Sequence, residues 1–196
     1  MADPNGPSPR KRNAAATKAN ILAAAKQCFS RAGYAQVGIR EIACAAGVSY
    51  TMVGRYFGSK AGLLEAALVD STSMASVTAV NRANFGENLM ALITADLANG
   101  DLTAMTVLAA GDPTARAIAQ RVVAEHVVGP LSEWLGGPEA RERAMAITML
   151  GGGFVIYSQQ LPIADSPVGP GHPLARWLVR SLQHVVDNPD CWRDCP

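Results

Sequence analysis

Aromatic and charged residues are both scarce in this chain of 196 residues, at 6% and 17% of the composition. The sequence also lacks runs of alternating β-branched residues, which argues against an extensive β-sheet, and its abundant alanine favours helices. No apolar stretch approaches the roughly 18 residues needed to cross a membrane. The segment 1–13 carries charges but no apolar core, unlike a secretory signal. We therefore expect an all-α cytoplasmic protein.

The residues that usually carry catalysis or hold metals are few and dispersed. The three histidines are far apart, and no nucleophile–base pair, paired carboxylates, metal-binding cluster or Gly-rich phosphate loop stands out. Cys28 and Cys44 fall on apolar helix faces and are expected in the core. Cys191 and Cys195 have no nearby partners for a zinc site; they are either reduced thiols or a redox-sensing pair. The sequence therefore predicts no metal, no cofactor and no enzymatic activity.

The segment 39–64, IREIACAAGVSYTMVGRYFGSKAGLL, is the most informative part of the chain. Apolar residues spaced three and four apart predict a helix over 39–46. Gly47 can end that helix in a left-handed conformation, and Ser49 is a suitable N-cap for a second helix. A short Gly-containing turn between two helices is the arrangement that lays its second helix in the DNA major groove. An ordinary helical hairpin is the alternative reading.

The distribution of charge favours DNA. Residues 1–64 contain nine Lys or Arg and two acidic residues, a net charge of +7, whereas residues 65–196 carry a net charge of −6. A basic segment that coincides with a helix-turn-helix pattern is typical of a surface that binds a polyanion. The arm 1–12 ends in three consecutive basic residues, and it either reaches the DNA or is a tail with incidental charge.

The segment 17–68 resembles the N-terminal domain of the tetracycline-repressor (TetR) family of bacterial transcription regulators. The matching pieces are TKANILAAAKQCFSRAGY, IREIACAAGVS and VGRYFGSK, followed by LLEAAL. The resemblance implies a three-helix DNA-binding head on an all-helical, dimeric, ligand-binding body. It also implies that the recognition helix lies within 49–57 and that Lys60 grips a DNA phosphate.

Two positions depart from the pattern of that family. Gly38 stands where a Ser or Thr usually caps the second helix, so a side-chain phosphate contact is lost there. Gly54 stands where the family usually has a tyrosine that touches the DNA backbone, so that role falls on Tyr50, Arg55 or Tyr56 or is unfilled. These departures affect the expected DNA contacts rather than the fold. The residues expected to contact DNA are Arg40, Ser49, Tyr50, Thr51, Met52, Arg55, Tyr56 and Lys60.

The remainder of the chain is expected to form helices separated by Gly and Pro. Periodicity and caps predict a first helix from Thr17 to Gly33, a fourth from Ser59 into the low 80s, and further helices over 87–98, up to Gly111, 113–135 with a kink at Gly129-Pro130, 138–161, and from 173 onward. The expected organisation is an arm (1–12), a helix-turn-helix domain (13–66), an effector-binding and dimerisation domain (67–188) and a tail (189–196).

Two sets of residues are expected to carry binding in the body. Aromatic, Met and His side chains are candidates for an effector pocket, although each can instead fill core: Phe85, Met90, Met105, His126, Trp134 and Tyr157. By resemblance, the last two long helices form the dimer interface, for which the candidates are Ile147, Gly151, Phe154, Trp177, Leu178 and Leu182. Three glycines at 151–153 within a helix either break it or allow close approach of another backbone; the preserved apolar spacing favours close approach.

These observations together predict a sequence-specific DNA-binding regulator. We expect a homodimeric repressor that a small apolar or amphipathic effector releases from a double-stranded operator. Phosphate contacts would set its position, while Tyr50, Thr51 and Met52 would read base edges. One alternative is a helical module that binds a ligand or protein and has lost DNA binding, which Gly54 keeps open. The other is a small helical enzyme, which no catalytic motif supports.

Overall fold

The computed structural model describes residues 9–72, 81–95, 102–163, 168–169 and 171–189. This part of the chain is helical and contains no strand, as expected for an all-α protein. The elements, in chain order, are α1 Pro9–Gln36, α2 Ile39–Ala45, α3 Tyr50–Phe57, α4 Lys60–Asp70, η1 Arg82–Asn84, α6 Phe85–Ala95, α7 Leu102–Ala109, α8 Pro113–Val123, η3 Ala124–Val128, α9 Gly129–Leu135, α10 Ala140–Val155, η4 Ile156–Gln160 and α11 Pro173–Asp187.

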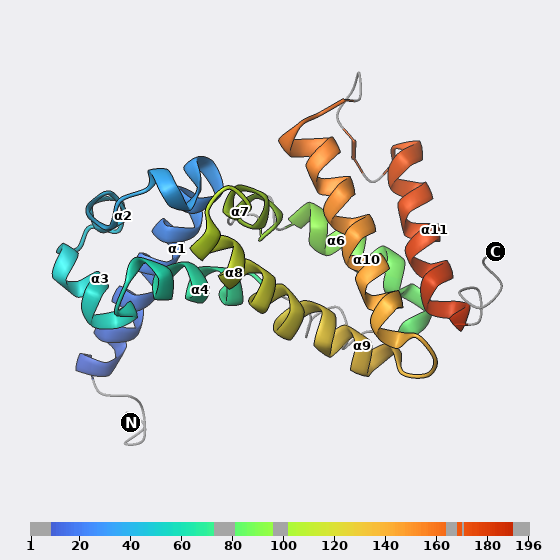
Figure 1. Cartoon of the computed structure of the whole chain (residues 1–196), viewed down its shortest axis with the longest axis horizontal. Coiled ribbons are helices and arrows are strands. Elements are labelled where there is room, and N and C mark those ends of the chain that lie inside the picture. The colour runs from blue at the N-terminus through green and yellow to red at the C-terminus, as the bar shows by residue number, and fades with distance from the viewer. Residues whose placement is uncertain (1–8, 73–80, 96–101, 164–167, 170, 190–196) are drawn as a thin grey trace, which may run out of the picture.

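The helices are arranged in two groups that a long central helix connects. Helices α1 to α4 form a head at one end of the molecule, and α10 and α11 stand side by side at the other end (Figure 1). Helix α8 leaves the head and continues through η3 and α9 to the base of α10. Helices α6 and α7 lie between the two ends.

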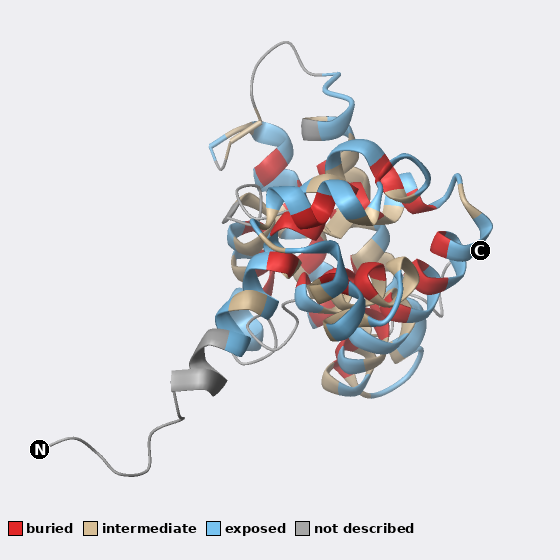
Figure 2. Ribbon diagram, turned by 90° about the vertical axis from the view of Figure 1, so that its left-hand side faces the viewer, coloured by how far each residue is buried: buried red, intermediate tan, exposed pale blue. Residues whose placement is uncertain are grey.

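Buried side chains form two separate clusters, one for each group. We call the first the head cluster; it joins apolar residues of α1 to α4 with residues of α7 and α8, including Met105, Ile118 and Val122. The second, the bundle cluster, joins residues of α6, η3, α9, α10 and α11. Figure 2 shows the buried residues on the inward faces of the helices. The head therefore shares its core with α7 and α8, beyond the expected domain boundary at residue 66.

Several helix ends agree with their sequence signals. Asp112 caps α8, its side chain accepting a hydrogen bond from the Ala115 N–H at 2.9 Å, and Pro113 occupies the first turn. His172 caps α11 in the same way, with Nδ1 3.2 Å from the Leu174 N–H. The kink expected at Gly129-Pro130 takes the form of the π-helical segment η3, in which the Gly129 N–H donates to Ala124 O. A π turn accommodates a proline that cannot donate to an α-helical ladder.

Other boundaries differ from the prediction. Helix α1 begins at Pro9 rather than Thr17 and has a kink at Gly33, where φ is +75°. Helix α4 ends at Asp70 rather than in the low 80s, with Ser71 as its C-cap. The Ser71 hydroxyl donates a hydrogen bond to Ala67 O at 3.0 Å. Such a local side-chain bond competes with the backbone hydrogen bonds of the helix and favours its end at this position. The expected helix end at Asn99-Gly100 and the redox pair of tail cysteines lie outside the described residues.

Candidate nucleic-acid interface and effector cavity

The turn between α2 and α3 has the geometry that its sequence predicts. Gly47 adopts a left-handed backbone with φ of +66°, and the next residue, Val48, donates its N–H to Ala43 O at 3.0 Å. Val53, on the inner face of α3, is buried in the head cluster, and Val48 packs against that cluster. These contacts fix the angle between α2 and α3 and leave the opposite face of α3 free.

The N-caps of α2 and α3 lack the usual side-chain bond to the backbone. Ser49 occupies the N-cap of α3, but its hydroxyl instead shares a 2.9 Å hydrogen bond with the Thr51 hydroxyl. Gly38, which has no side chain, is the N-cap of α2. The Gly38 N–H donates a long hydrogen bond, 3.5 Å, to the Glu41 carboxylate. Glu41 therefore replaces part of the cap that a Ser or Thr would supply.

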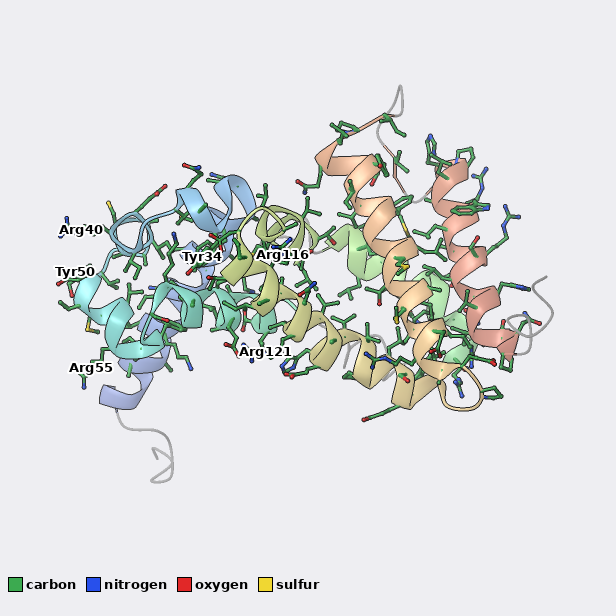
Figure 3. The ribbon with its side chains drawn as sticks, viewed as in Figure 1. Tyr34, Arg40, Tyr50, Arg55, Arg116 and Arg121 are labelled. Atoms are coloured by element: carbon green, nitrogen blue, oxygen red, sulfur yellow. The ribbon has the colours of Figure 1, made fainter. Side chains whose placement is uncertain are left out.

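Five of the eight residues expected to contact DNA are exposed on the head. Tyr50 is 57% exposed, and Arg40, Thr51 and Arg55 are also exposed. The Arg40 guanidinium lies 5.8 Å from the centroid of the Tyr50 ring, which joins the start of α2 to the start of α3. Arg40, Tyr50 and Arg55 lie along the same end of the molecule, away from the body (Figure 3). Ser49 is exposed as well, whereas Met52, Tyr56 and Lys60 are half-buried.

Lys60 is held by a residue that the sequence analysis did not select. Its ammonium lies 4.4 Å from the centroid of the Tyr34 ring, at the end of α1. A cation over an aromatic face is attracted to it, so Tyr34 orients Lys60 at the start of α4. The sequence does contain one indication of this role, because Tyr34 is the aromatic residue directly after Gly33 in the segment 17–68 that resembles the TetR head.

Gly54 leaves a bare position on α3. A Cβ at this position would meet nothing within 4 Å, so no neighbouring side chain takes the space of the usual tyrosine. Gly62, in contrast, is required by packing, because its Cβ would lie 2.4 Å from the Phe57 carbonyl oxygen. The close approach at Gly62 sets the angle between the recognition helix and α4.

A cavity of about 970 Å³ lies between the two groups of helices. Its size is that of a pocket for a small molecule. Ser71 and Thr72, directly after α4, form one side together with side chains from α7 and α8, and side chains from α6, η3, α9, α10 and η4 form the other. Among the described residues, its charged lining consists of Arg116 and Arg141, and most of the remaining lining is aliphatic.

None of the six residues expected to bind the effector is among those that line this cavity. Phe85 and Trp134 stack on each other in the bundle cluster, with ring centroids 5.1 Å apart. Met90 is buried in the bundle cluster and Met105 in the head cluster. His126 and Tyr157 are exposed. The prediction favoured aromatic, Met and His side chains, whereas the cavity walls consist mostly of small and aliphatic residues.

The glycine triplet lines the cavity instead of allowing close approach of a backbone. A Cβ on Gly151 would make an ordinary 3.5 Å contact with Ile93, and a Cβ on Gly152 or Gly153 would meet nothing within 4 Å. The helix continues through all three residues. Within the single chain, the expected close approach of another helix at Gly151 is therefore absent, and the triplet keeps space open on the cavity side of α10.

Half of the predicted dimer residues belong to the core of the single chain. Ile147, Leu178 and Leu182 are at most 1% exposed, so their side chains have no surface to offer to a partner. Phe154 is half-buried and Trp177 is 53% exposed. Other large apolar side chains exposed on α10, η4 and α11 are Met145, Met149, Tyr157 and Leu174; the two methionines also line the cavity. Trp177 also borders a hollow of about 470 Å³ between α10 and α11.

One ion pair joins the head to the helix that lines the cavity. The Arg121 guanidinium on α8 donates two hydrogen bonds to the Glu65 carboxylate on α4, at 2.8 and 3.0 Å. These bonds lower the pKa of Glu65 and raise the pKa of Arg121. The pair therefore persists at neutral pH and is lost as the pH falls through the pKa of Glu65. Lys26 of α1 also pairs with Asp70 at the end of α4.

The two cysteines in the described head are reduced thiols in different settings. Cys28 is half-buried, and burial raises the pKa of its thiol. Cys44 is exposed, which corrects its expected place in the core. No group of three or more His, Cys, Asp or Glu residues that could hold a metal occurs in the described ranges. No helix within these ranges is long and apolar enough to span a membrane.

The helix-turn-helix head, its exposed basic edge and the helical body with a cavity define the class of helical DNA-binding regulators with a ligand-binding body. Comparison with known families identifies the particular family. The family described as bacterial regulatory proteins, tetR family, matches residues 21–67. The tetracyclin repressor-like C-terminal domain matches residues 83–186, more than half of the chain. The chain therefore belongs to the TetR family and is a DNA-binding transcription regulator.

Solved structures share the fold at low sequence identity. A TetR-family regulator from Streptomyces coelicolor A3 is 23% identical, with a TM-score of 0.54 over 93% of this chain and 99% of that one. The reduced form of E. coli NemR is 19% identical, with a TM-score of 0.61 over 86% and 97%. Salmonella enterica GusR is 18% identical, with a TM-score of 0.63 over 87% and 95%. None of the curated proteins matches the chain.

Proposed function

We propose that this regulator is a homodimeric, cytoplasmic, non-enzymatic repressor that leaves its operator when a small apolar or amphipathic effector enters the cavity. The observation that carries the proposal is the position of α8. One face of α8 lines the cavity through Ala119 and Val123, while Ile118 and Val122 on the same helix are buried with α4 in the head cluster. Movement of α8 upon effector binding would therefore change the position of the head.

The exposed edge of the head supports a particular division of the DNA contacts. Arg40, Arg55 and Lys60 provide cations for backbone phosphates. Tyr50, Thr51 and Met52 begin the recognition helix, where the first turn reaches base edges. Ser49 and Tyr56 flank this turn. With Gly54 bare, the Tyr50 ring beside Arg40 takes over part of the backbone contact of the missing tyrosine.

Binding to DNA is expected to depend strongly on salt and on Lys60. If a dimer makes about 6–10 phosphate contacts, its affinity should fall roughly 10³–10⁵-fold between 50 and 200 mM salt. Lys60→Ala should weaken binding to all duplex sequences about equally and reduce the salt slope, whereas Thr51→Ala should change sequence preference. Fluorescence anisotropy with duplexes from the DNA flanking its own gene measures both. Arg176→Ala, on α11 at the other end of the molecule, is the matched control and should leave the dependence of affinity on salt unchanged. Affinity of the unmodified protein that does not change with salt would contradict the phosphate contacts.

The outer face of α10 and α11 is the proposed dimer surface. Trp177 and Leu174 of α11 expose large apolar areas there, and such patches mark interaction sites on soluble proteins. Phe154 contributes its exposed part. The proposed surface therefore uses exposed residues of the same two helices in place of the buried Ile147, Leu178 and Leu182.

Filling the cavity should separate effector binding from DNA binding. Gly152→Phe adds a ring where a Cβ meets open space, and we expect it to abolish binding of Nile red, a neutral apolar dye, without weakening DNA binding. Gly152→Ala is the control and should retain the dye, because one methyl group occupies little of the cavity. Dye fluorescence and operator anisotropy are measured on the same samples. Full dye binding in Gly152→Phe would place the effector elsewhere.

A further inference from the structure

The charge of the cavity lining is opposite to that of the surrounding chain. Residues 65–196 carry a net charge of −6, yet the charged side chains in the described lining are Arg116 and Arg141, with no carboxylate among them. A cavity that presents only cations among aliphatic walls favours an anionic group on an otherwise apolar ligand.

Most of the hydroxyl groups in the lining cannot provide hydrogen-bond donors to a ligand. The hydroxyls of Ser71, Thr72, Thr106 and Thr148 donate to carbonyls of their own helices, at 3.0, 2.7, 2.9 and 2.8 Å. Each hydroxyl has a single hydrogen to donate. Apart from Thr103, the remaining donors for a ligand anion are the arginines and the one amide of the lining, Gln120.

Arg116 and Gln120 form a pair of donors on α8. They are one helical turn apart, so both side chains project from the same face, and both border the cavity. Asp112, one turn before Arg116, is the nearest acidic residue on this helix, but its carboxylate caps the Ala115 N–H at 2.9 Å. In the described part of the chain, neither of the two ion pairs involves Arg116. The guanidinium is thus available for a planar oxyanion.

The same face of α8 becomes apolar beyond this pair. Val123, Val127 and Leu131 continue the cavity lining along α8, η3 and α9, and the glycine triplet of α10 lines the cavity as well. The polar end of a ligand would therefore lie at the head side of the cavity, with its apolar part toward the bundle cluster.

We propose that the effector is an amphipathic carboxylate, with its carboxylate bound by the Arg116 guanidinium and the Gln120 amide and its apolar chain along η3, α9 and Gly151–Gly153. This inference rests on the proposed effector cavity and specifies its ligand class. An Arg–carboxylate pair is bidentate and charge-assisted. Arg121, the residue after Gln120, holds Glu65 of the head. Arg116 and Arg121 lie on different sides of α8 (Figure 3), so the anion and the head would act on one helix from two sides.

The test compares ligands of equal chain length that differ in charge. Decanoate, decanol and decyltrimethylammonium, each below its micelle concentration, compete with Nile red for the cavity of the full-length protein. In the unmodified protein, decanoate should displace the dye and the cationic compound should not. Arg116→Met should weaken decanoate roughly ten- to hundredfold, the effect of removing a hydrogen bond to a charged group, and should change decanol less than about threefold. Gln120→Leu should weaken decanoate by a smaller factor, and Arg176→Met, on α11 outside the cavity lining, is the matched control. A larger loss in Arg141→Met than in Arg116→Met would place the carboxylate at the other arginine of the lining and overturn the Arg116 site.

Two results would overturn the anion site. Equal weakening of decanoate and decanol in Arg116→Met would mean that Arg116 only shapes the wall, and unchanged decanoate affinity would remove its role altogether. Either result leaves the effector cavity intact, because dye and decanol still report on it. Conversely, decanoate that binds through Arg116 but does not release operator DNA would support the anion site and contradict the proposed repressor mechanism.

Discussion

Replacing Gly86 with alanine should destabilise this protein by about 2–3 kcal/mol, since overpacking a tight contact costs this much. A Cβ on Gly86, in the first turn of α6, would lie 2.2 Å from Val179 O and 3.1 Å from Val179 C of α11. Both are backbone atoms, which cannot rotate away, so α6 and α11 would have to separate. The Gly86 N–H also donates to Gln183 Oε1 at 3.1 Å and would lose this bond.

A thermal unfolding curve measures this effect, with an expected decrease in Tm of roughly 5–10 °C for a domain of this size. Gly152→Ala is the matched control, because its Cβ meets open space within α10. It should instead stabilise the protein by up to about 1 kcal/mol through helix propensity. An unchanged Tm in Gly86→Ala would mean that α6 and α11 are not in close contact.

Replacing Arg143 with methionine should cost about 2–4 kcal/mol, the order expected when buried carbonyls lose a charged donor. Arg143 is only 1% exposed, and its guanidinium donates to Val185 O at 3.1 Å, Val186 O at 3.0 Å and Gly136 O at 3.2 Å. Val185 and Val186 lie in the last turn of α11, whose carbonyls have no partner within the helix. A cation at this end also interacts favourably with the helix dipole.

Urea unfolding of Arg143→Met and Arg141→Met provides a matched comparison. Arg141 lies two residues earlier on α10 and is exposed, so its replacement should change the free energy of unfolding by less than about 0.5 kcal/mol. Arg143→Lys retains the charge but not the planar arrangement of donors, and we expect a stability between the two. Equal stability of all three variants would show that Arg143 does not hold the end of α11.

The sequence predicted the head better than the body because its signals there are local. Gly47 requires a left-handed backbone and Val53 lies on an apolar face, and both features can be read from neighbouring residues. Asp112 and His172 cap their helices through contacts that span at most three residues. The turn between α2 and α3 and the exposed start of α3 follow from such short-range patterns, whereas the start of α1 and the end of α4 do not.

The cavity and the close contacts of the body depend on residues far apart in sequence. Gly86 meets Val179 because α6 packs against α11, and nothing in the sequence around Gly86 indicates a contact with a residue so far along the chain. Residue type alone was also a poor guide to the pocket, because the Phe85 and Trp134 rings stack on each other and do not line the cavity. Arg143 carried no distinguishing signal either, since it stands in the charged run Arg141-Glu142-Arg143.

Because the buried residues divide into two clusters, we expect this protein to unfold as two cooperative units rather than one. Leu102 is the one partly buried side chain, among the described residues, that packs against both clusters, and the cavity occupies the space where a continuous core would otherwise lie. Units joined by so few contacts open independently. A molecule in the cavity would touch both units at once and raise the energetic cost of opening either one alone. In the absence of a ligand, the head can therefore fluctuate against the bundle without unfolding it.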